Sequence, residues 1–282
     1  MPNADLEAMR RHGFTFSKAM GQNFLVNPGV CPRMAVLCGA DKTCGVLEIG
    51  PGAGTLTRAL ANVAGKVVAV ELDPRLLPVL AETLAGCGNV TVVQGDILAL
   101  DLPALLREHF ADMPVHVCAN LPYYITSPVI MRLLESRLPL ASITVMVQKE
   151  AAQRLCARMG SRECGAVTAA VEYYAEAKLL FPVSRGSFMP VPNVDSAVMR
   201  LTPRAAPPVQ VDEAAFFRLV KAAFGQRRKT AANAVSAGLG LEKSAVLAAM
   251  ERAGLPLAAR AENISLEGYA ALLGELNLIL AN

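Results

Sequence analysis

The sequence predicts an α/β fold, in which a parallel sheet carries helices on both faces, followed by a small all-helical C-terminal domain. Up to about residue 150, short β-branched runs alternate with helically spaced stretches, the pattern of parallel strands joined by helices. Residues 202–208 hold three prolines and are typical of a linker. From Asp212 onward, apolar residues recur at helical spacing.

The elements of the predicted sheet domain follow one another in a regular order. Most of the strands are short apolar runs that end at a polar residue, and the stretches between them have helical spacing. Residues 181–203 are rich in Pro, Ser and Val, which predicts a loop with short strands. The predicted strands are 46–49, 67–70, 90–93, 115–119 and 143–147, and the predicted helices are 55–63, 74–84, 102–110 and 127–135.

The C-terminal part has a clear helix start. Asp212 is a residue type preferred at helix N-caps, and the apolar residues after it keep helical spacing up to Gly225. Residues 242–252 and 265–280 continue the helical pattern. The sequence therefore predicts a flexible N-terminal extension over 1–17, an α/β domain over 18–203 and a helical domain over 204–282.

The composition excludes several classes of protein. With 53% hydrophobic and 18% charged residues, the chain of 282 residues has enough apolar material for a core, which excludes a disordered chain. The net charge of +3, from 27 basic and 24 acidic residues, excludes a polybasic coat protein but leaves room for a local basic patch.

Other sequence features indicate the compartment. No apolar run approaches the roughly 18 residues that span a bilayer, and residues 1–18 contain no hydrophobic signal core. The seven cysteines form no C-x-x-C pair, which predicts buried free thiols in a reducing compartment. Three scattered histidines do not supply the clustered ligands of a zinc site, so no metal is expected. We therefore expect a soluble, cytoplasmic protein without membrane association.

A glycine-rich segment follows the first predicted strand. Residues 48–54 read Glu-Ile-Gly-Pro-Gly-Ala-Gly, and glycines there allow tight backbone angles and close approach of a ligand. The segment is not the GxGxxG dinucleotide fingerprint, because Thr55 stands where the last glycine would be. It is not a P-loop either, because no Gly-Lys-Ser/Thr follows. The segment thus predicts a different kind of nucleotide-cofactor loop.

Polar residues end the predicted strands on one rim of the sheet. Glu71 lies roughly 20 residues past the glycines, where a carboxylate can accept both hydroxyls of a ribose. Asp96 ends the next strand and can accept an adenine amino group. Glu48 and Asn120 belong to the same rim, where ligands of open α/β sheets bind. Asp73, which precedes a proline, is instead predicted to cap a helix.

The most specific signal is the sequence Asn-Leu-Pro-Tyr at residues 120–123. The exocyclic amine of a purine is a poor nucleophile because its lone pair is delocalised into the ring. Two acceptors, the side-chain oxygen of Asn120 and the carbonyl oxygen of Leu121, can pyramidalise the amine and direct its lone pair at an electrophile. Tyr123 offers a ring face on which a base stacks, worth about 1–3 kcal/mol. The segment thus predicts chemistry on a purine amino group.

In these motifs the sequence resembles the S-adenosylmethionine-dependent rRNA adenine N6-dimethyltransferases. Within that family it is most similar to the bacterial branch that acts on small-subunit (16S) rRNA. The resemblance extends from residue 18 to residue 280. Further matching blocks occur in the family's order at residues 21–25, 148–150, 187–196, 224–230 and 260–263.

The resemblance implies a Rossmann-like class I methyltransferase domain over 18–203 that uses S-adenosyl-L-methionine, and an RNA-binding domain over 204–282. It implies dimethylation of the N6 amines of two adjacent adenines in a 3′-terminal hairpin loop of 16S rRNA, with a role in small-subunit biogenesis. The cofactor-binding residues that it implies are Asn23, Leu25, Gly50, Glu71, Asp96 and Asn120. The catalytic residues at the target adenine are Asn120, Leu121, Tyr123 and Phe188.

One block departs from the family pattern. The family usually has Tyr-Gly-Arg-Leu-Ser-Val after its Gln-Lys-Glu motif, whereas residues 164–169 read Cys-Gly-Ala-Val-Thr-Ala. The aromatic residue and the arginine are absent, which puts any substrate contact of theirs in doubt. The neighbouring blocks are intact, so no loss of activity is inferred.

Basic residues gather at the start of the helical part. Between residues 214 and 241 every charged residue is basic, which suits phosphate contact and salt-sensitive RNA binding. The expected partner is small-subunit rRNA or a pre-30S particle, bound by a monomer. The predicted RNA-binding residues are Arg218, Lys221, Arg227, Arg228 and Lys229.

Other functions stay open at this point. A large-subunit rRNA dimethyltransferase of the macrolide-resistance type is one, although the blocks at 224–230 and 260–263 favour the small-subunit branch. An RNA-binding assembly factor, with methylation secondary, is excluded by no residue. A DNA adenine methyltransferase is disfavoured by Asn120 and Leu121. A NAD-dependent dehydrogenase is disfavoured by Thr55 and by the lack of a placed catalytic histidine.

Overall fold

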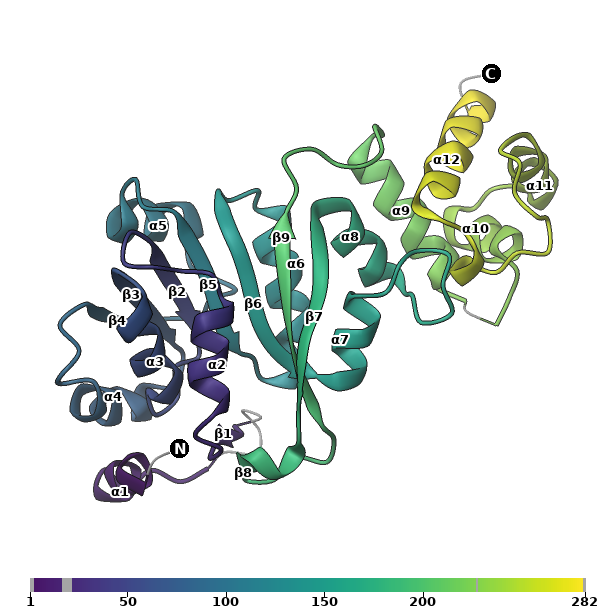
Figure 1. Cartoon of the computed structure of the whole chain (residues 1–282). Coiled ribbons are helices and arrows are strands. Elements are labelled where there is room, and N and C mark those ends of the chain that lie inside the picture. The colour runs from purple at the N-terminus through teal and green to yellow at the C-terminus, as the bar shows by residue number, and fades with distance from the viewer. Residues whose placement is uncertain (1–2, 17–21, 227, 281–282) are drawn as a thin grey trace. The chain divides into compact units, whose positions relative to one another are not determined.

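The computed structural model describes residues 3–16, 22–226 and 228–280 (Figure 1). The chain divides into two compact units, each made of two segments. The first unit is Met1–Ala152 with Lys178–Pro203, and the second is Gln153–Ala177 with Arg204–Asn282. Gln153–Ala177 thus belongs to the helical unit and not, as a linear division at residue 203 implied, to the sheet domain.

The first unit is built on a seven-stranded sheet. Its strands are β2 Gly45–Ile49, β3 Lys66–Glu71, β4 Val90–Gln94, β5 Val115–Asn120, β6 Leu140–Gln148, β7 Ala175–Val183 and β9 Ser196–Pro203. They lie in the order β4-β3-β2-β5-β6-β9-β7. The five strands predicted from β-branched runs are parallel, with Ile49 opposite both Val70 and Ala119. Their carboxyl ends therefore meet at one edge.

The segment expected as a loop with short strands is more regular than that. β9 pairs antiparallel with β6 along its length, and β7 spans nine residues. Along the chain, the short strand β8, Phe188–Met189, lies between β7 and β9. The apolar run Ala197, Val198, Met199 is fully buried because β9 lies inside the sheet, between β6 and β7. Most prolines and serines of residues 181–203 precede this run, and they hid the strand in the sequence.

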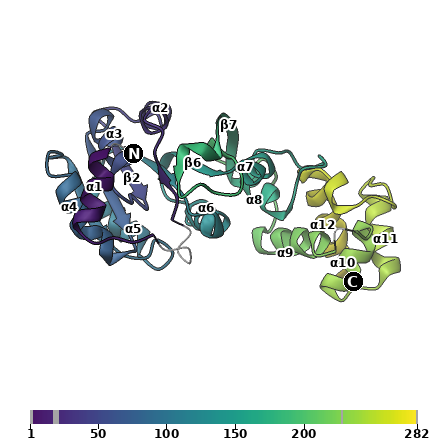
Figure 2. The same cartoon turned by 90° about the horizontal axis from the view of Figure 1, so that it is seen from below.

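Helices cover both faces of the sheet (Figure 2). On one face lie α2, Val30–Leu37, and α3, Thr55–Val63; on the other lie α5, Leu102–Phe110, and α6, Thr126–Glu135. A 3-10 turn over Pro74–Leu76 leads into α4, Leu77–Thr83. On the first of these faces, apolar residues of both helices and of six strands of the sheet form one buried cluster that includes Met34, Leu60, Val46, Val67 and Cys118.

The N-terminal segment is a packed helix over Asn3–Arg11, α1, and not a flexible extension. Ala8 and Met9 are buried in a cluster with residues of α4. Asp5 is 2% exposed and forms an ion pair with Arg58 of α3, with 2.7 Å between Oδ2 and Nη2. The residues that α1 contacts are distant from it in the sequence, so the local sequence did not predict these contacts.

The second unit is helical. Its helices are α8 Ala166–Tyr174, α9 Glu213–Phe224, α10 Ala231–Leu239, α11 Lys243–Arg252 and α12 Leu266–Leu280. Both α7, Lys149–Leu155, and β7 span a division between the units along the chain. Asp212 caps α9 as predicted, because its Oδ1 accepts from the N–H of Ala215 at 2.7 Å. Tyr173 of α8 stacks on Phe216 of α9, with ring centroids 5.9 Å apart. Across the described ranges, no helix is long and apolar enough to span a membrane.

Candidate active site

The carboxyl ends of the parallel strands border a cavity in the first unit. The cavity is lined by residues 22–25, by the glycine loop after β2 and by the ends of β3, β4 and β5. This is the edge at which open α/β sheets bind their ligands. Every residue predicted to bind the cofactor or the target adenine lines this one cavity: Asn23, Leu25, Gly50, Glu71, Asp96, Asn120, Leu121, Tyr123 and Phe188.

The loop between β2 and α3 presents backbone to the cavity. Gly50 has a φ of +69°, in the left-handed region that favours glycine. A Cβ added there would meet no atom within 4 Å, so the space beside this backbone is open to a ligand. Gly54 has a φ of +84°, and a Cβ there would lie 3.0 Å from Leu84 and Thr83. Close approach of a ligand is thus possible at Gly50, whereas packing requires a glycine at position 54.

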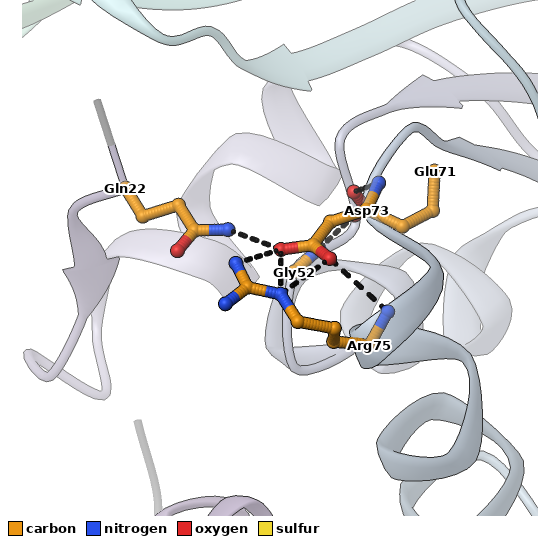
Figure 3. A network of polar contacts seen from close by, with 5 residues as sticks. All are labelled: Gln22, Gly52, Glu71, Asp73 and Arg75. Atoms are coloured by element: carbon orange, nitrogen blue, oxygen red, sulfur yellow. Dashed lines mark hydrogen bonds and ion pairs between the residues drawn. The ribbon is translucent and has the colours of Figure 1, made fainter. Parts of the chain in front are cut away.

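Glu71, at the end of β3, is fixed by backbone amides (Figure 3). The N–H of Asp73 donates to its Oε1 at 2.8 Å, and the N–H of Gly52 donates to its Oε2 at 3.2 Å. Burial raises the pKa of this carboxyl, and these hydrogen bonds lower it. Each carboxylate oxygen has a further lone pair, so Glu71 can still accept from the hydroxyls of a ribose.

Beside Glu71, the Asp73 side chain connects Gln22 with the turn that contains Arg75 (Figure 3). Its Oδ1 accepts from the N–H of Arg75 at 3.1 Å, which confirms the predicted helix cap. The Arg75 guanidinium lies 2.7 Å from its Oδ2 and holds the pKa of Asp73 below its usual value. Gln22 donates to the same oxygen at 2.9 Å and so ties residues 22–25 to the cavity. The role of Gln22 was not predicted, although it lies in the matching block 21–25.

Asn120 ends β5. Its Nδ2 donates to the backbone carbonyl of Asn23 at 3.3 Å. This bond uses the donor side of the amide and leaves Oδ1 to accept from a bound amine. The N–H of Leu121 donates to the carbonyl of Met146 at 3.2 Å, which fixes the backbone next to the second predicted acceptor. The two acceptors therefore stand on a strand end that is bonded to the segments around it.

Two aromatic rings line the same cavity. The hydroxyl of Tyr123 lies 2.8 Å from Oγ of Ser196, a fully buried residue of β9. Burial raises the pKa of Tyr123, so the phenol stays neutral. Phe188 lies opposite Leu25, because β8 pairs antiparallel with the short strand β1, Phe24–Leu25. Tyr123 is partly exposed and Phe188 is 2% exposed, so Tyr123 offers the more open ring face.

Asp96 lies in the turn that follows β4. Its Oδ1 accepts from the N–H of Leu98 at 2.9 Å, and its side chain is exposed. The next residue, Ile97, is buried and lines the cavity. An apolar surface beside a carboxylate suits a flat base that carries an amino group.

The predicted RNA-binding residues lie in the second unit. Arg218 and Lys221 lie one turn apart on α9, and both are exposed. Arg228 and Lys229 are exposed in the turn before α10. Arg227 lies outside the described residues. The described members of the set are thus accessible to a phosphate backbone.

The block that departs from the family pattern forms the start of α8. The Cys164 thiol is buried and donates to the carbonyl of Glu262 at 3.7 Å. The Thr168 hydroxyl accepts from the N–H of Gly165 at 2.9 Å and donates to the carbonyl of Arg154 at 2.8 Å. These contacts give the block a packing role within the second unit.

Comparison with known proteins identifies the family. A sequence model described as ribosomal RNA adenine dimethylase matches residues 13–277. The chain belongs to this family. Curated relatives carry the name ribosomal RNA small subunit methyltransferase A. The relative from Geobacillus thermodenitrificans is 46% identical over 96% of this chain and 94% of its own length. The one from Bacillus licheniformis is 46% identical over 97% of this chain and 96% of its own length.

Two solved structures agree with the family and the fold. A dimethyladenosine transferase from Plasmodium falciparum is 25% identical, with a TM-score of 0.74 over 90% of this chain and 98% of that one. The 23S rRNA methyltransferase ErmE is 30% identical, with a TM-score of 0.68 over 90% of this chain and 99% of that one. The predicted Rossmann-like class I methyltransferase fold is thereby confirmed.

The cofactor of the rRNA adenine dimethylase family is S-adenosylmethionine, and the cavity fits it. The open backbone at Gly50 admits a ligand, Glu71 can accept from a ribose, and Asp96 with Ile97 can hold an adenine. In the part of the chain that the structure describes, no group of three or more His, Cys, Asp or Glu side chains could hold a metal ion.

The hydrogen bond between Tyr123 and Ser196 yields a prediction. The S196A variant should raise the KM for RNA several-fold and leave the Kd for S-adenosylmethionine unchanged, because it frees the Tyr123 ring to turn. The fold should lose about 1 kcal/mol, the net worth of one hydrogen bond. The Y123F variant removes the same bond from the other side, so the double variant should be no worse than either single one. Additive effects on KM would show that the bond does not position the ring.

Proposed function

We propose that this protein transfers methyl groups from S-adenosylmethionine to the N6 amines of two adjacent adenines in a 3′-terminal hairpin loop of small-subunit rRNA, as a step of small-subunit biogenesis. The observation that carries the proposal is the hydrogen bond of Asn120. Its amide nitrogen is engaged with Asn23 in the cofactor cavity, and its oxygen remains for the amine of a target base.

Asn120 and Leu121 make the adenine amine nucleophilic. Acceptors at both of its hydrogens pull the nitrogen out of conjugation with the ring and direct its lone pair. When bound, S-adenosylmethionine supplies a methyl group that is already electrophilic, so the protein chiefly has to position the amine. Holding two reactants in line contributes about 7–11 kcal/mol to a reaction of this kind. Asn120 is neutral and is not a base, so the extra proton of the methylated nitrogen leaves to water.

Two aromatic side chains receive the target base. An adenine must leave its stack to enter the cavity, at a cost of a few kcal/mol. Stacking on Tyr123, with Phe188 on the other side of the base, offsets this cost. The singly methylated amine has one hydrogen left, so the second transfer proceeds with one of the two acceptors unused.

The second unit binds the RNA phosphates. Arg218, Lys221, Arg228 and Lys229 are exposed, and none of them forms an ion pair within the described residues. Sequence-specific RNA binding favours loops and unpaired bases, which suits a hairpin target. We place the reaction in the cytoplasm, on free small-subunit rRNA or a pre-30S particle, with the protein acting as a monomer.

The basic surface predicts salt dependence. The variant with both R218A and K221A should bind RNA more weakly at low salt. The slope of log K against log salt concentration should become shallower by roughly 1 to 2, because two phosphate contacts are lost. K243A removes an exposed lysine of α11 and serves as the matched control. An unchanged slope in the double variant would place the RNA elsewhere.

The second candidate function is dimethylation of large-subunit rRNA, because ErmE shares the fold at 30% identity. The small-subunit assignment rests on relatives that are 42–49% identical and carry the small-subunit name. A direct test offers labelled S-adenosylmethionine with unmethylated small subunits, with unmethylated large-subunit rRNA and with adenine-containing DNA. Label in the small subunits alone supports the proposal. Label in large-subunit rRNA alone favours the second candidate.

A further inference from the structure

Glu48 is an acid buried in the middle of the sheet. It lies on β2, between Ala69 of β3 and Cys118 of β5. Its side chain is 1% exposed, yet it belongs to the cavity lining. Within the described residues, neither carboxyl oxygen has a hydrogen-bond partner, and the hydroxyl of Thr57 has none either. Burying an unpaired charge is strongly unfavourable, so this carboxyl requires a partner or a proton.

Among the residues that the structure describes, the titratable groups that contact Glu48 supply no positive charge. Glu71, from β3, is itself an acid and raises the pKa of Glu48. Cys31, from α2, is a thiol whose pKa burial raises to about 12. Cys118, from β5, also has a raised pKa, chiefly through its hydrogen bond with Cys38 and through burial. Both Cys31 and Cys118 are therefore neutral at physiological pH.

The cation on the neighbouring helix is already paired. Arg58 of α3 lies 2.7 Å from Asp5 of α1. Burial raises the pKa of Glu48 from 4.5 to about 8. The acid is therefore mainly protonated at pH 7 when the cavity holds no cation.

We infer that Glu48 is a proton-linked charge sensor of the cofactor site. Its carboxyl is neutral before binding, and it loses its proton to solvent when a cationic group of S-adenosylmethionine enters the cavity. The O–H bond of the acid breaks, and the carboxylate becomes the partner of the incoming cation. S-adenosylmethionine carries two such cations, its sulfonium and its α-ammonium, and the product S-adenosylhomocysteine keeps only the ammonium.

The inference rests on the cofactor and not on the RNA. It therefore stands or fails separately from the proposed RNA substrate.

Proton release also makes the affinity for S-adenosylmethionine depend on pH. Below the pKa of about 8, binding has to displace a proton, so the affinity for S-adenosylmethionine should rise with pH, at most about tenfold per pH unit between pH 6 and 7.5.

Isothermal titration calorimetry tests the inference without any methyl transfer. S-adenosylmethionine is titrated into the full-length protein at pH 7 in phosphate and in Tris, whose ionisation enthalpies differ. The dependence of the observed enthalpy on the buffer gives the number of protons released. The wild-type protein should release close to one proton more than the E48Q variant, and E48Q should bind about tenfold more weakly or worse, with little dependence on pH.

A control variant and a stability measurement complete the test. E108Q removes an exposed glutamate of α5 and should release as many protons as the wild type. The amide of E48Q mimics the protonated acid, so the fold should persist. Because the folded pKa of about 8 lies above the unfolded value of 4.5, Glu48 costs the empty protein stability as pH rises from 4.5 to 8. The melting temperature of empty E48Q should therefore exceed that of the wild type more at pH 8 than at pH 5.

Titration with S-adenosylhomocysteine shows which of the two cations, the sulfonium or the ammonium, causes the proton release. Proton release with S-adenosylmethionine alone identifies the sulfonium as the group sensed, so that the site favours reactant over product. Release with both ligands identifies the ammonium. Equal proton release in wild type and E48Q, or an affinity of E48Q equal to that of the wild type at every pH, would overturn the inference. Should E48Q fail to fold, a wild-type affinity that does not change between pH 6 and 7.5 would overturn it equally.

Discussion

The N120A variant should lower kcat for methyl transfer roughly 100-fold or more, the scale for the loss of one preorganised polar contact to a transition state. The reason lies in the geometry of the amide. Its nitrogen is bonded to the carbonyl of Asn23, so its oxygen is the group available to the target amine. Alanine removes that acceptor. The Kd for S-adenosylmethionine should change by no more than about threefold, since the contact is made chiefly in the transition state.

Single-turnover methyl transfer at saturating cofactor and RNA measures the effect on the chemical step. N120D is the matched variant, because its carboxylate keeps the acceptor and cannot donate to Asn23. Its rate should lie between those of the wild type and N120A. If kcat of N120A equalled that of the wild type, Asn120 would not act on the amine.

The E71Q variant should have the opposite signature. Its Kd for S-adenosylmethionine should rise roughly 10- to 100-fold, because hydrogen bonds to a charged acceptor are worth about 1.5–3 kcal/mol. At saturating cofactor, kcat should stay within about threefold of the wild type, since Glu71 does not touch the reacting nitrogen. Glutamine keeps one oxygen for a backbone amide, so the link between Gly52 and Asp73 is only partly lost.

The Kd for S-adenosylmethionine is measured by calorimetry or by the fluorescence quenching of a labelled cofactor. E108Q is the control for the loss of an exposed glutamate, on α5. Together, N120A and E71Q separate catalysis from binding within one cavity. A Kd of E71Q equal to that of the wild type would remove Glu71 from the cofactor site.

Local patterns in the sequence were sufficient to predict the strands that build the site. β-branched runs located β2 to β6, and the polar residues that follow these runs pointed to Glu71, Asp96 and Asn120. This works because parallel strands end at one edge, so order along the chain translates directly into proximity. The cap at Asp73 was predictable from the local sequence, because an aspartate that precedes a proline is typical of a helix start.

Contacts between distant segments were not predictable in this way. The pairing of Asp5 with Arg58 holds α1 in place, and it joins residues 53 positions apart. Ser196 supports Tyr123 from β9, a strand whose antiparallel insertion the sequence concealed. The full burial of Glu48 followed from β2 lying inside the sheet with helices over it, which no local pattern around that residue indicates.

The identity of the methylated product tests the central claim most directly. Unmethylated small subunits are incubated with the protein and S-adenosylmethionine, and the rRNA is digested to nucleosides and analysed by mass spectrometry. The account predicts N6,N6-dimethyladenosine, two per particle, on adjacent adenines of the 3′-terminal hairpin. Loss of both with N120A would tie the product to this cavity. Monomethyladenosine alone, or methyl groups on another base, would contradict the account.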